Sequence, residues 1–172
     1  MKNKAMEQRL NDEILEFVNS RKSLQLATLG QDNLPFASYA PFAIKGDSLY
    51  VLLSDIAVHG LNLLREPQAS VLLIEDEDTA EELFARVRVN YRITAQAPSP
   101  DSPDWDEGIR CLTDRLGTRP AKLAQLADFH LFQLFPESGR YVQGFGKAYA
   151  LTGGTLANAE ILHLQEGHRA RA

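Results

Sequence analysis

Apolar residues recur at helical spacing near the beginning of the chain. Leu10, Ile14, Phe17 and Val18 would lie on one face of a helix, with acidic and amide side chains between them. We therefore expect an amphipathic helix from about Met6 to Ser20.

The pattern then changes to the alternation that is typical of strands. Three strands are expected, over Ser23–Leu29, Leu34–Ile44 and Ser48–Ser54, with turn residues at 30–33 and 45–47. Pro35 and Pro41 in the second strand favour an edge or a bulge, because proline cannot donate to a ladder. The short connections predict an antiparallel meander.

The rest of the chain adds further strands and short helices. A short helix is expected over Val58–Glu66, ended by Pro67, and the apolar run Ala69–Ile74 is typical of a strand buried on both faces. We also expect a long strand over Leu83–Ala97, a helix over Asp104–Leu116 capped by Asp104 and ended by Gly117, a helical piece over Ala121–Leu126, and strands over Phe129–Phe135, Arg140–Leu151 and Ile161–Leu164. This inventory predicts an α+β fold with a closed or half-closed antiparallel barrel.

Length and composition limit the class of protein. The 172 residues suit one domain, 1–172, with an N-terminal helix over 1–20 and a mobile tail over 165–172. The 18 basic and 23 acidic residues give a net charge of −5, which argues against a general nucleic-acid binder. No apolar stretch is long enough to cross a bilayer and the first residues lack a signal-peptide core, so we expect a cytoplasmic protein without membrane contact.

An arginine-rich strand is the most informative chemical feature. Alternation over 83–97 places Phe84, Arg86, Arg88, Asn90 and Arg92 on one face, and Val87, Val89, Tyr91 and Ile93 on the other. Three arginines side by side repel one another unless an anion is near. Two interpretations stay open: the acidic segment 75–82 neutralises them, or they bind a carboxylate or phosphate ligand.

Histidines and the single cysteine give weaker signals. His59, His130, His163 and His168 form no zinc-hydrolase motif, and each is compatible with a structural or surface position. Cys111 alone excludes an internal disulfide framework and is expected to be inert. The segment 144–147, Gly-Phe-Gly-Lys, lacks the spacing of a phosphate-binding loop and is better explained as a bend.

Taken in order, several segments resemble a known family. LQLATLGQDNLPFASYAPFAI (24–44), SLYVLLSDIAVHGLNLLREPQASVLLIEDE (48–77) and LFARVRVNY (83–91) are similar to the flavin-binding split-barrel superfamily of pyridoxamine 5′-phosphate oxidase. Within it, DFHLFQLFPESGRYVQGFGKAY (128–149) and LQEGHR (164–169) resemble the HutZ and HugZ group of haem-utilisation proteins. The resemblance covers about residues 21–169.

This resemblance implies a homodimer of antiparallel split β-barrels with flanking helices and ligand sites at the subunit interface. It implies haem binding, oxidative opening of the porphyrin and release of iron, with electrons from an external donor and haem from a delivery protein. Flavin is generally absent from the group.

The resemblance also implies roles for particular residues. His168 matches the axial ligand of the haem iron, and Asp128 matches the acidic residue that hydrogen-bonds this histidine. His59 and Arg88 match pocket positions, and Arg86, Arg88 or Arg92 would meet the haem propionates. Asp128 and Arg88 are thus the candidate catalytic residues, and His168, His59, Arg86 and Arg92 the candidate haem-binding residues.

Three functions are compatible with these features. The first is a haem-degrading oxygenase. The second is an FMN-dependent oxidoreductase on the same barrel, in which the arginines would bind the ribityl phosphate. The third is a haem-binding or storage protein without turnover. The tail histidine favours haem, because flavin needs no axial ligand.

Overall fold

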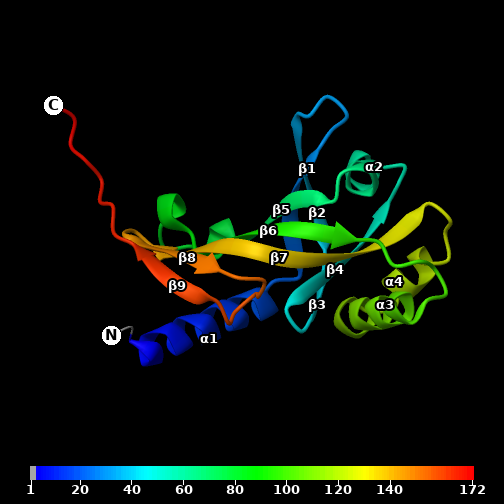
Figure 1. The fold of residues 1–172 in the computed structure, drawn as a ribbon, viewed down its shortest axis with the longest axis horizontal. Coiled ribbons are helices and arrows are strands. Elements are labelled where there is room, and N and C mark those ends of the chain that lie inside the picture. Colours follow the sequence, from blue (N-terminus) through cyan, green and yellow to red (C-terminus); the bar gives the residue numbers. More distant parts are fainter. Residues whose placement is uncertain (1–2) are drawn as a thin grey trace.

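The computed structural model describes residues 3–172 as a curled antiparallel sheet with helices packed against it (Figure 1). The helices are α1 (Lys4–Ser20), α2 (Val58–Arg65), α3 (Pro103–Leu116) and α4 (Arg119–Leu123), with short 3-10 turns η1 (Glu77–Thr79) and η2 (Leu83–Ala85). The strands are β1 (Ser23–Leu29), β2 (Pro35–Pro41), β3 (Ala43–Lys45), β4 (Ser48–Ser54), β5 (Gln68–Ile74), β6 (Arg88–Gln96), β7 (Phe129–Gly144), β8 (Lys147–Thr152) and β9 (Glu160–Leu164).

The sheet divides along its longest strand, β7. Its order is β2-β1-β5-β6-β7-β4-β3, and β8 and β9 attach beyond this path. One edge of β7 pairs with β6, whereas the other edge is shared: residues 129–134 pair with β4 and residues 138–144 pair with β8. This arrangement confirms the predicted α+β class and the antiparallel split barrel.

The two ends of the sheet are joined by the chain and not by a ladder. β2 and β3 lie at opposite ends of the strand order, yet only Phe42 separates them in sequence. Pro41 has no N–H to donate, and the Phe42 N–H donates to the Lys22 carbonyl at 3.1 Å while its ring is fully buried. The predicted continuous strand over Leu34–Ile44 is therefore wrong, and so is a simple three-strand meander.

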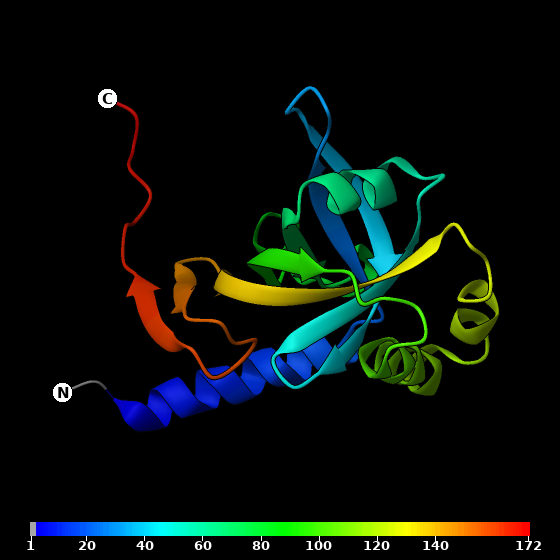
Figure 2. The ribbon, with the colours of Figure 1, turned by 45° about the vertical axis from the view of Figure 1, so that its right-hand side comes forward.

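The main core fills the concave side of the sheet. Leu10, Ile14 and Val18 of α1 pack against the inward-facing side chains of the strands, and α1 runs along the sheet in both views (Figures 1 and 2). Val89, Tyr91 and Ile93 of β6 point into this core, as the alternation predicts. The Tyr91 hydroxyl donates to the Leu156 carbonyl at 2.7 Å and ties the segment before β9 to the barrel.

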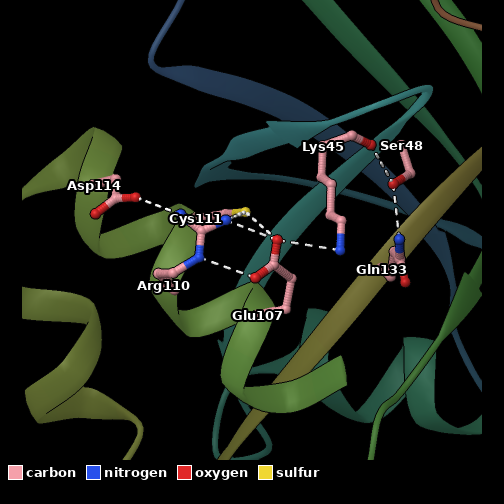
Figure 3. A network of polar contacts seen from close by, with 7 residues as sticks. All are labelled: Lys45, Ser48, Glu107, Arg110, Cys111, Asp114 and Gln133. Carbon is pink, nitrogen blue, oxygen red and sulfur yellow. Dashed lines mark hydrogen bonds and ion pairs between the residues drawn. The ribbon is translucent and has the colours of Figure 1, made fainter. Parts of the chain in front are cut away.

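A second cluster fixes α3 to the opposite side of β4 and β7. Leu112 packs with Tyr50 and Leu131, and Gly108 permits this approach, because a Cβ there would lie 2.5 Å from Leu131. Figure 3 shows the polar edge of this contact, where Glu107 pairs with Lys45 at 3.2 Å and Arg110 at 2.7 Å. Hydrogen bonds from Arg110 and Lys45 lower the pKa of Glu107 to about 2. Burial raises the pKa of the Cys111 thiol, which agrees with the expected inert cysteine.

The predicted long strand over Leu83–Ala97 begins later than expected. Residues 83–85 form the 3-10 turn η2, and the Glu82 carboxylate accepts from the Phe84 N–H at 2.9 Å. The Val87 N–H is satisfied by the Glu75 carboxylate at 2.8 Å, so the β6 ladder starts only at Arg88. Phe84 and Arg86 therefore do not share the strand face of Arg88, Asn90 and Arg92.

Two further boundaries differ from the sequence prediction. Two strands are expected from the sequence, over Phe129–Phe135 and Arg140–Leu151. Instead, β7 continues from Phe129 to Gly144, and β8 is the shorter strand that follows it. β7 can continue through Pro136 because the β6–β7 register shifts there. Gly144-Phe145-Gly146-Lys147 forms the tight β7–β8 turn, with Gly146 at φ 68°. The cap of α3 is Ser102, whose hydroxyl accepts from the Trp105 N–H at 3.2 Å, and not Asp104.

No helix within residues 3–172 is both long and apolar enough to cross a membrane.

Candidate functional site

A hollow of about 810 Å³ lies at the C-terminal end of β7, between the outer face of the sheet and the last residues of the chain. This volume suits a ligand of cofactor size. Its walls come from β5 to β9, from the turn before β6, and from the tail: Leu72, Phe84, Ala85, Arg88, Asn90, Arg140, Val142, Gly144, Phe145, Gly146, Ala148, His163, Leu164, Gln165, Glu166, Gly167 and His168.

Two arginines give the hollow a positive floor. β6 and β7 pair Asn90 with Arg140 and Arg88 with Val142, so both guanidinium groups leave the sheet on the face opposite the core. Arg88 donates to the Arg86 carbonyl at 3.0 Å. Within residues 3–172 neither Arg88 nor Arg140 forms an ion pair, although Glu166 of the tail lines the same space. Two unpaired guanidinium groups on one face suit an anionic ligand.

Large apolar side chains flank this floor. Phe84 is 88% exposed and Phe145 is 58% exposed, and Leu72, Val142 and Leu164 complete an apolar wall. Exposure of large apolar side chains to water is unfavourable, and such a patch with charged residues beside it is typical of a binding surface. The hollow therefore suits a ligand that has an apolar part and also carries negative groups.

Two imidazoles border the same space. The His168 ring lies 6.1 Å from the Phe145 ring in an edge-on arrangement, at the outer side of the hollow. His163 is held more firmly: its ring stacks on Tyr149 at 5.0 Å, and its Nε2 donates to the Gly146 carbonyl at 3.1 Å. Residues 165–172 are exposed and have no regular secondary structure, so His168 is the less constrained of the two.

The other two arginines of the predicted stripe lie elsewhere. Arg86 donates to the Glu75 carbonyl and pairs with Glu77 at 3.7 Å, so the acidic segment neutralises this arginine and it does not line the hollow. Arg92 lines a separate, smaller hollow of about 270 Å³ with Ser70 and Glu137. Of the three arginines considered from the sequence, only Arg88 faces the main hollow.

Asp128 and His59 lie near the connection between β4 and α2. The Asp128 carboxylate accepts from the Ser54 hydroxyl at 2.5 Å, and its carbonyl accepts from the Asp55 N–H at 2.8 Å. His59 is on the first turn of α2, where its Nδ1 contacts the Ser38 hydroxyl at 2.9 Å. Burial lowers the pKa of His59, so this ring is neutral at pH 7.

The structure does not bring the candidate residues into one place within a chain. Asp128 directly precedes β7, whereas the hollow with Arg88 and His168 lies at the other end of that strand. Figures 1 and 2 both show the C-terminal segment on one side of the molecule and the α3–α4 end of β7 on the other. The sequence also missed Arg140, because the predicted strands did not give the pairing that places it beside Arg88.

The hollow offers imidazole and guanidinium groups to a ligand. Within residues 3–172, no group of three or more His, Cys, Asp or Glu side chains is arranged to hold a metal ion. Iron in a porphyrin needs only one protein imidazole, and the propionates of the porphyrin need cations. His168 would offer such an imidazole, and Arg88 and Arg140 such cations, because all three line one hollow.

The sheet that divides along β7 makes this chain a split-barrel protein. It belongs to the pyridoxamine 5′-phosphate oxidase family, whose model matches residues 10–143.

Comparison with individual proteins narrows the relationship. The chain is 43% identical over 169 residues to "Heme oxygenase HutZ" from Vibrio cholerae serotype O1, covering 98% of this chain and 95% of that protein. A crystal structure of HutZ from Vibrio cholerae matches with a TM-score of 0.71 and 44% identity, over 74% of this chain and 90% of that one. The description of that structure calls HutZ a haem storage protein.

Two more distant structures have the same fold. ChuZ of Campylobacter jejuni matches with a TM-score of 0.82 and 27% identity over 95% of this chain and 66% of that one. A haem-binding protein of Mycobacterium smegmatis matches with a TM-score of 0.77 and 26% identity over 88% of this chain and 61% of that one. The resemblance inferred from the sequence is thus confirmed: the chain is a homologue of HutZ in the split-barrel family.

Proposed function

We propose that this protein is a haem-degrading oxygenase that opens the porphyrin and releases its iron. The observation that carries the proposal is the placement of the tail imidazole of His168 at a hollow that also presents Arg88 and Arg140 beside an apolar wall. The 43% identity to a haem oxygenase supports the same chemistry.

In this proposal, each group of the hollow meets one part of haem. Arg88 and Arg140 bind the propionates, for which paired guanidinium donors are suited. Phe84, Phe145 and Leu164 contact the apolar face of the ring and exclude water. The imidazole of His168 would bind the iron through one ring nitrogen.

The complete site is proposed to form between two subunits of a homodimer. An iron-bound imidazole needs an acceptor for its second ring N–H, which orients the ring and raises its basicity. Asp128 is the proposed acceptor, and it lies at the opposite end of β7 from the tail of its own chain. A two-fold axis across the outer sheet face would bring Asp128 and His59 of one subunit to the hollow of the other.

Bound haem supplies dioxygen activation once an external cytoplasmic donor provides electrons. The protein residues bind the ring, fix the imidazole through Asp128 and keep the hollow dry. A haem-delivery protein is the proposed source of the haem.

Storage of haem without turnover is the second candidate, because the crystallised HutZ is described as a haem storage protein. An FMN-dependent oxidoreductase is the third candidate function, because the chain belongs to the pyridoxamine 5′-phosphate oxidase family. The structure favours haem over flavin through the histidine of the tail.

One spectroscopic experiment separates the three. The purified protein is titrated with hemin, and then an electron donor and air are added. An oxygenase gives a Soret band that decays while iron is released to a chelator. A stable Soret band under the same conditions supports storage, and a yellow protein that binds no hemin supports the flavin enzyme. Either of the last two results overturns the proposal.

A further inference from the structure

We infer that Ser54 is a positioning residue for the proposed haem site, holding the Asp128 carboxylate so that one oxygen is presented to the imidazole of the partner subunit's tail. This inference rests on the proposed function, and it assigns a role to a residue that neither the sequence pattern nor the relatives point out.

The contact between the two side chains is short and directed. The Ser54 hydroxyl donates to Asp128 Oδ2 at 2.5 Å, at the short end of the range for O–H···O hydrogen bonds. The same hydroxyl oxygen accepts from the Ile56 N–H at 3.1 Å. The Ser54 hydroxyl therefore links the Asp128 carboxylate to the backbone at the start of the β4–α2 connection.

The backbone around this pair is fixed on both sides. β4 and β7 pair Ser54 with Phe129, and the Asp55 N–H donates to the Asp128 carbonyl at 2.8 Å. α2 packs directly on this point: a Cβ at Gly60 would lie 2.1 Å from the Ser54 carbonyl oxygen. Ser54 is the last residue of β4 and Asp128 lies in the turn directly before β7, so both positions are held by the β4–β7 ladder, as precise positioning requires.

The carboxylate of the neighbouring Asp55 does not compete with Asp128 for the Ser54 hydroxyl. Asp55 is engaged with His130, whose Nε2 lies 2.9 Å from Asp55 Oδ2. Within residues 3–172, Asp128 Oδ1 forms no hydrogen bond. One oxygen of Asp128 is therefore fixed by Ser54, and the other is left to accept an N–H from outside the chain.

Removal of the hydroxyl would free the carboxylate to rotate about its terminal torsion, which has broad minima. The hydrogen bond to the iron-bound imidazole would then be less well aligned, and the ring would be a weaker ligand. The iron–histidine stretching frequency of the reduced haem complex reports this bond directly, and a merely structural role of Ser54 would not change it.

The chain offers a matched control on the same strand. Ser48 also lies in β4 and also bonds a β7 side chain, since its hydroxyl accepts from Gln133 Nε2 at 2.8 Å (Figure 3). Ser48→Ala removes a comparable hydrogen bond far from Asp128. Thermal unfolding of the haem-free variants shows whether Ser54→Ala and Ser48→Ala are equally folded.

The experiment records resonance Raman spectra of the reduced hemin complexes of the wild type, Ser54→Ala, Ser54→Thr, Ser48→Ala and Asp128→Asn. We expect Ser54→Ala to lower the iron–histidine frequency in the same direction as Asp128→Asn, while Ser54→Thr and Ser48→Ala keep the wild-type value. A wild-type frequency in Ser54→Ala together with a shift in Asp128→Asn overturns the role of Ser54 and leaves the proposed function intact. No hemin complex of the wild type removes the proposed iron site, and no shift in Asp128→Asn removes Asp128 as the acceptor of the imidazole N–H. Either result overturns this inference.

Discussion

Asp128 and His168 lie at opposite ends of the same strand. Asp128 directly precedes β7, and His168 contacts Phe145, which directly follows it. At about 3.3 Å per residue, the 16 residues of β7 separate the two positions by roughly 50 Å along the strand. A hydrogen bond between these residues therefore requires two chains, and this requirement makes the proposed site testable.

Replacement of the tail histidine should weaken haem binding. We expect His168→Ala to shift the Soret band of the hemin complex and lower hemin affinity at least tenfold, about 1.4 kcal/mol, because the iron loses its protein ligand. Titration monitored by absorbance measures both effects. His163→Ala is the matched variant, since that ring lines the same hollow but is held by Tyr149 and Gly146. If His163→Ala shifts the Soret band and His168→Ala does not, the axial ligand is assigned wrongly.

Arg88 and Arg140 should contribute to the affinity for hemin and not to the free energy of unfolding. Arg88→Gln and Arg140→Gln are each expected to weaken hemin binding about tenfold while changing the free energy of unfolding by less than about 0.5 kcal/mol. Arg92→Gln is the control, because Arg92 lines the separate hollow. Calorimetric titration and denaturant unfolding give the two quantities. Equal losses of affinity and stability in Arg88→Gln would indicate a structural arginine.

The half-buried imidazole of His59 should make folding sensitive to acid. Its pKa is lowered by burial, so the unfolded chain binds this proton more readily than the folded chain. The stability contribution of the neutral ring is complete above the unfolded pKa of about 6.5 and decreases as the pH falls below it. Urea unfolding at pH 5.5 and 7.5 should show a smaller pH dependence in His59→Gln than in the wild type. A pH dependence in His59→Gln equal to that of the wild type would contradict the assignment.

The cap of α3 gives a test of the fold itself. Ser102→Ala should lower the free energy of unfolding by about 1 kcal/mol, because the Trp105 N–H loses its acceptor. Asp104→Asn retains the cap and should cost less. Denaturant unfolding at neutral pH compares the two, and a larger loss in Asp104→Asn would restore Asp104 as the cap.

Local patterns predicted those parts of the fold in which one face is buried. The alternation of Val89, Tyr91 and Ile93 identified the core face of β6, and strands Ser23–Leu29 and Ser48–Ser54 have the predicted bounds. The beginning of β6 could not be predicted in this way, because the Glu75 side chain replaces a ladder partner for Val87. Sequence periodicity does not show such a long-range hydrogen bond.

The candidate site was predictable only in part for the same reason. Arg88 was found because it stands in a conspicuous run of arginines, whereas Arg140 became visible only through its pairing opposite Asn90. Ser54 gave no signal, since its role depends on a contact with Asp128, 74 positions further along the chain. Strand register and side-chain contacts must be known before such residues can be assigned.

Subunit complementation tests the two-chain site most directly. His168→Ala and Asp128→Ala proteins are each expected to degrade hemin poorly alone. After mixing and subunit exchange, half of the dimers are mixed, and each mixed dimer holds one site with both native residues, so roughly a quarter of all sites should regain wild-type turnover. We expect this recovery, measured as Soret decay and iron release. Good exchange without any recovery would show that Asp128 and His168 do not act together across the subunit interface.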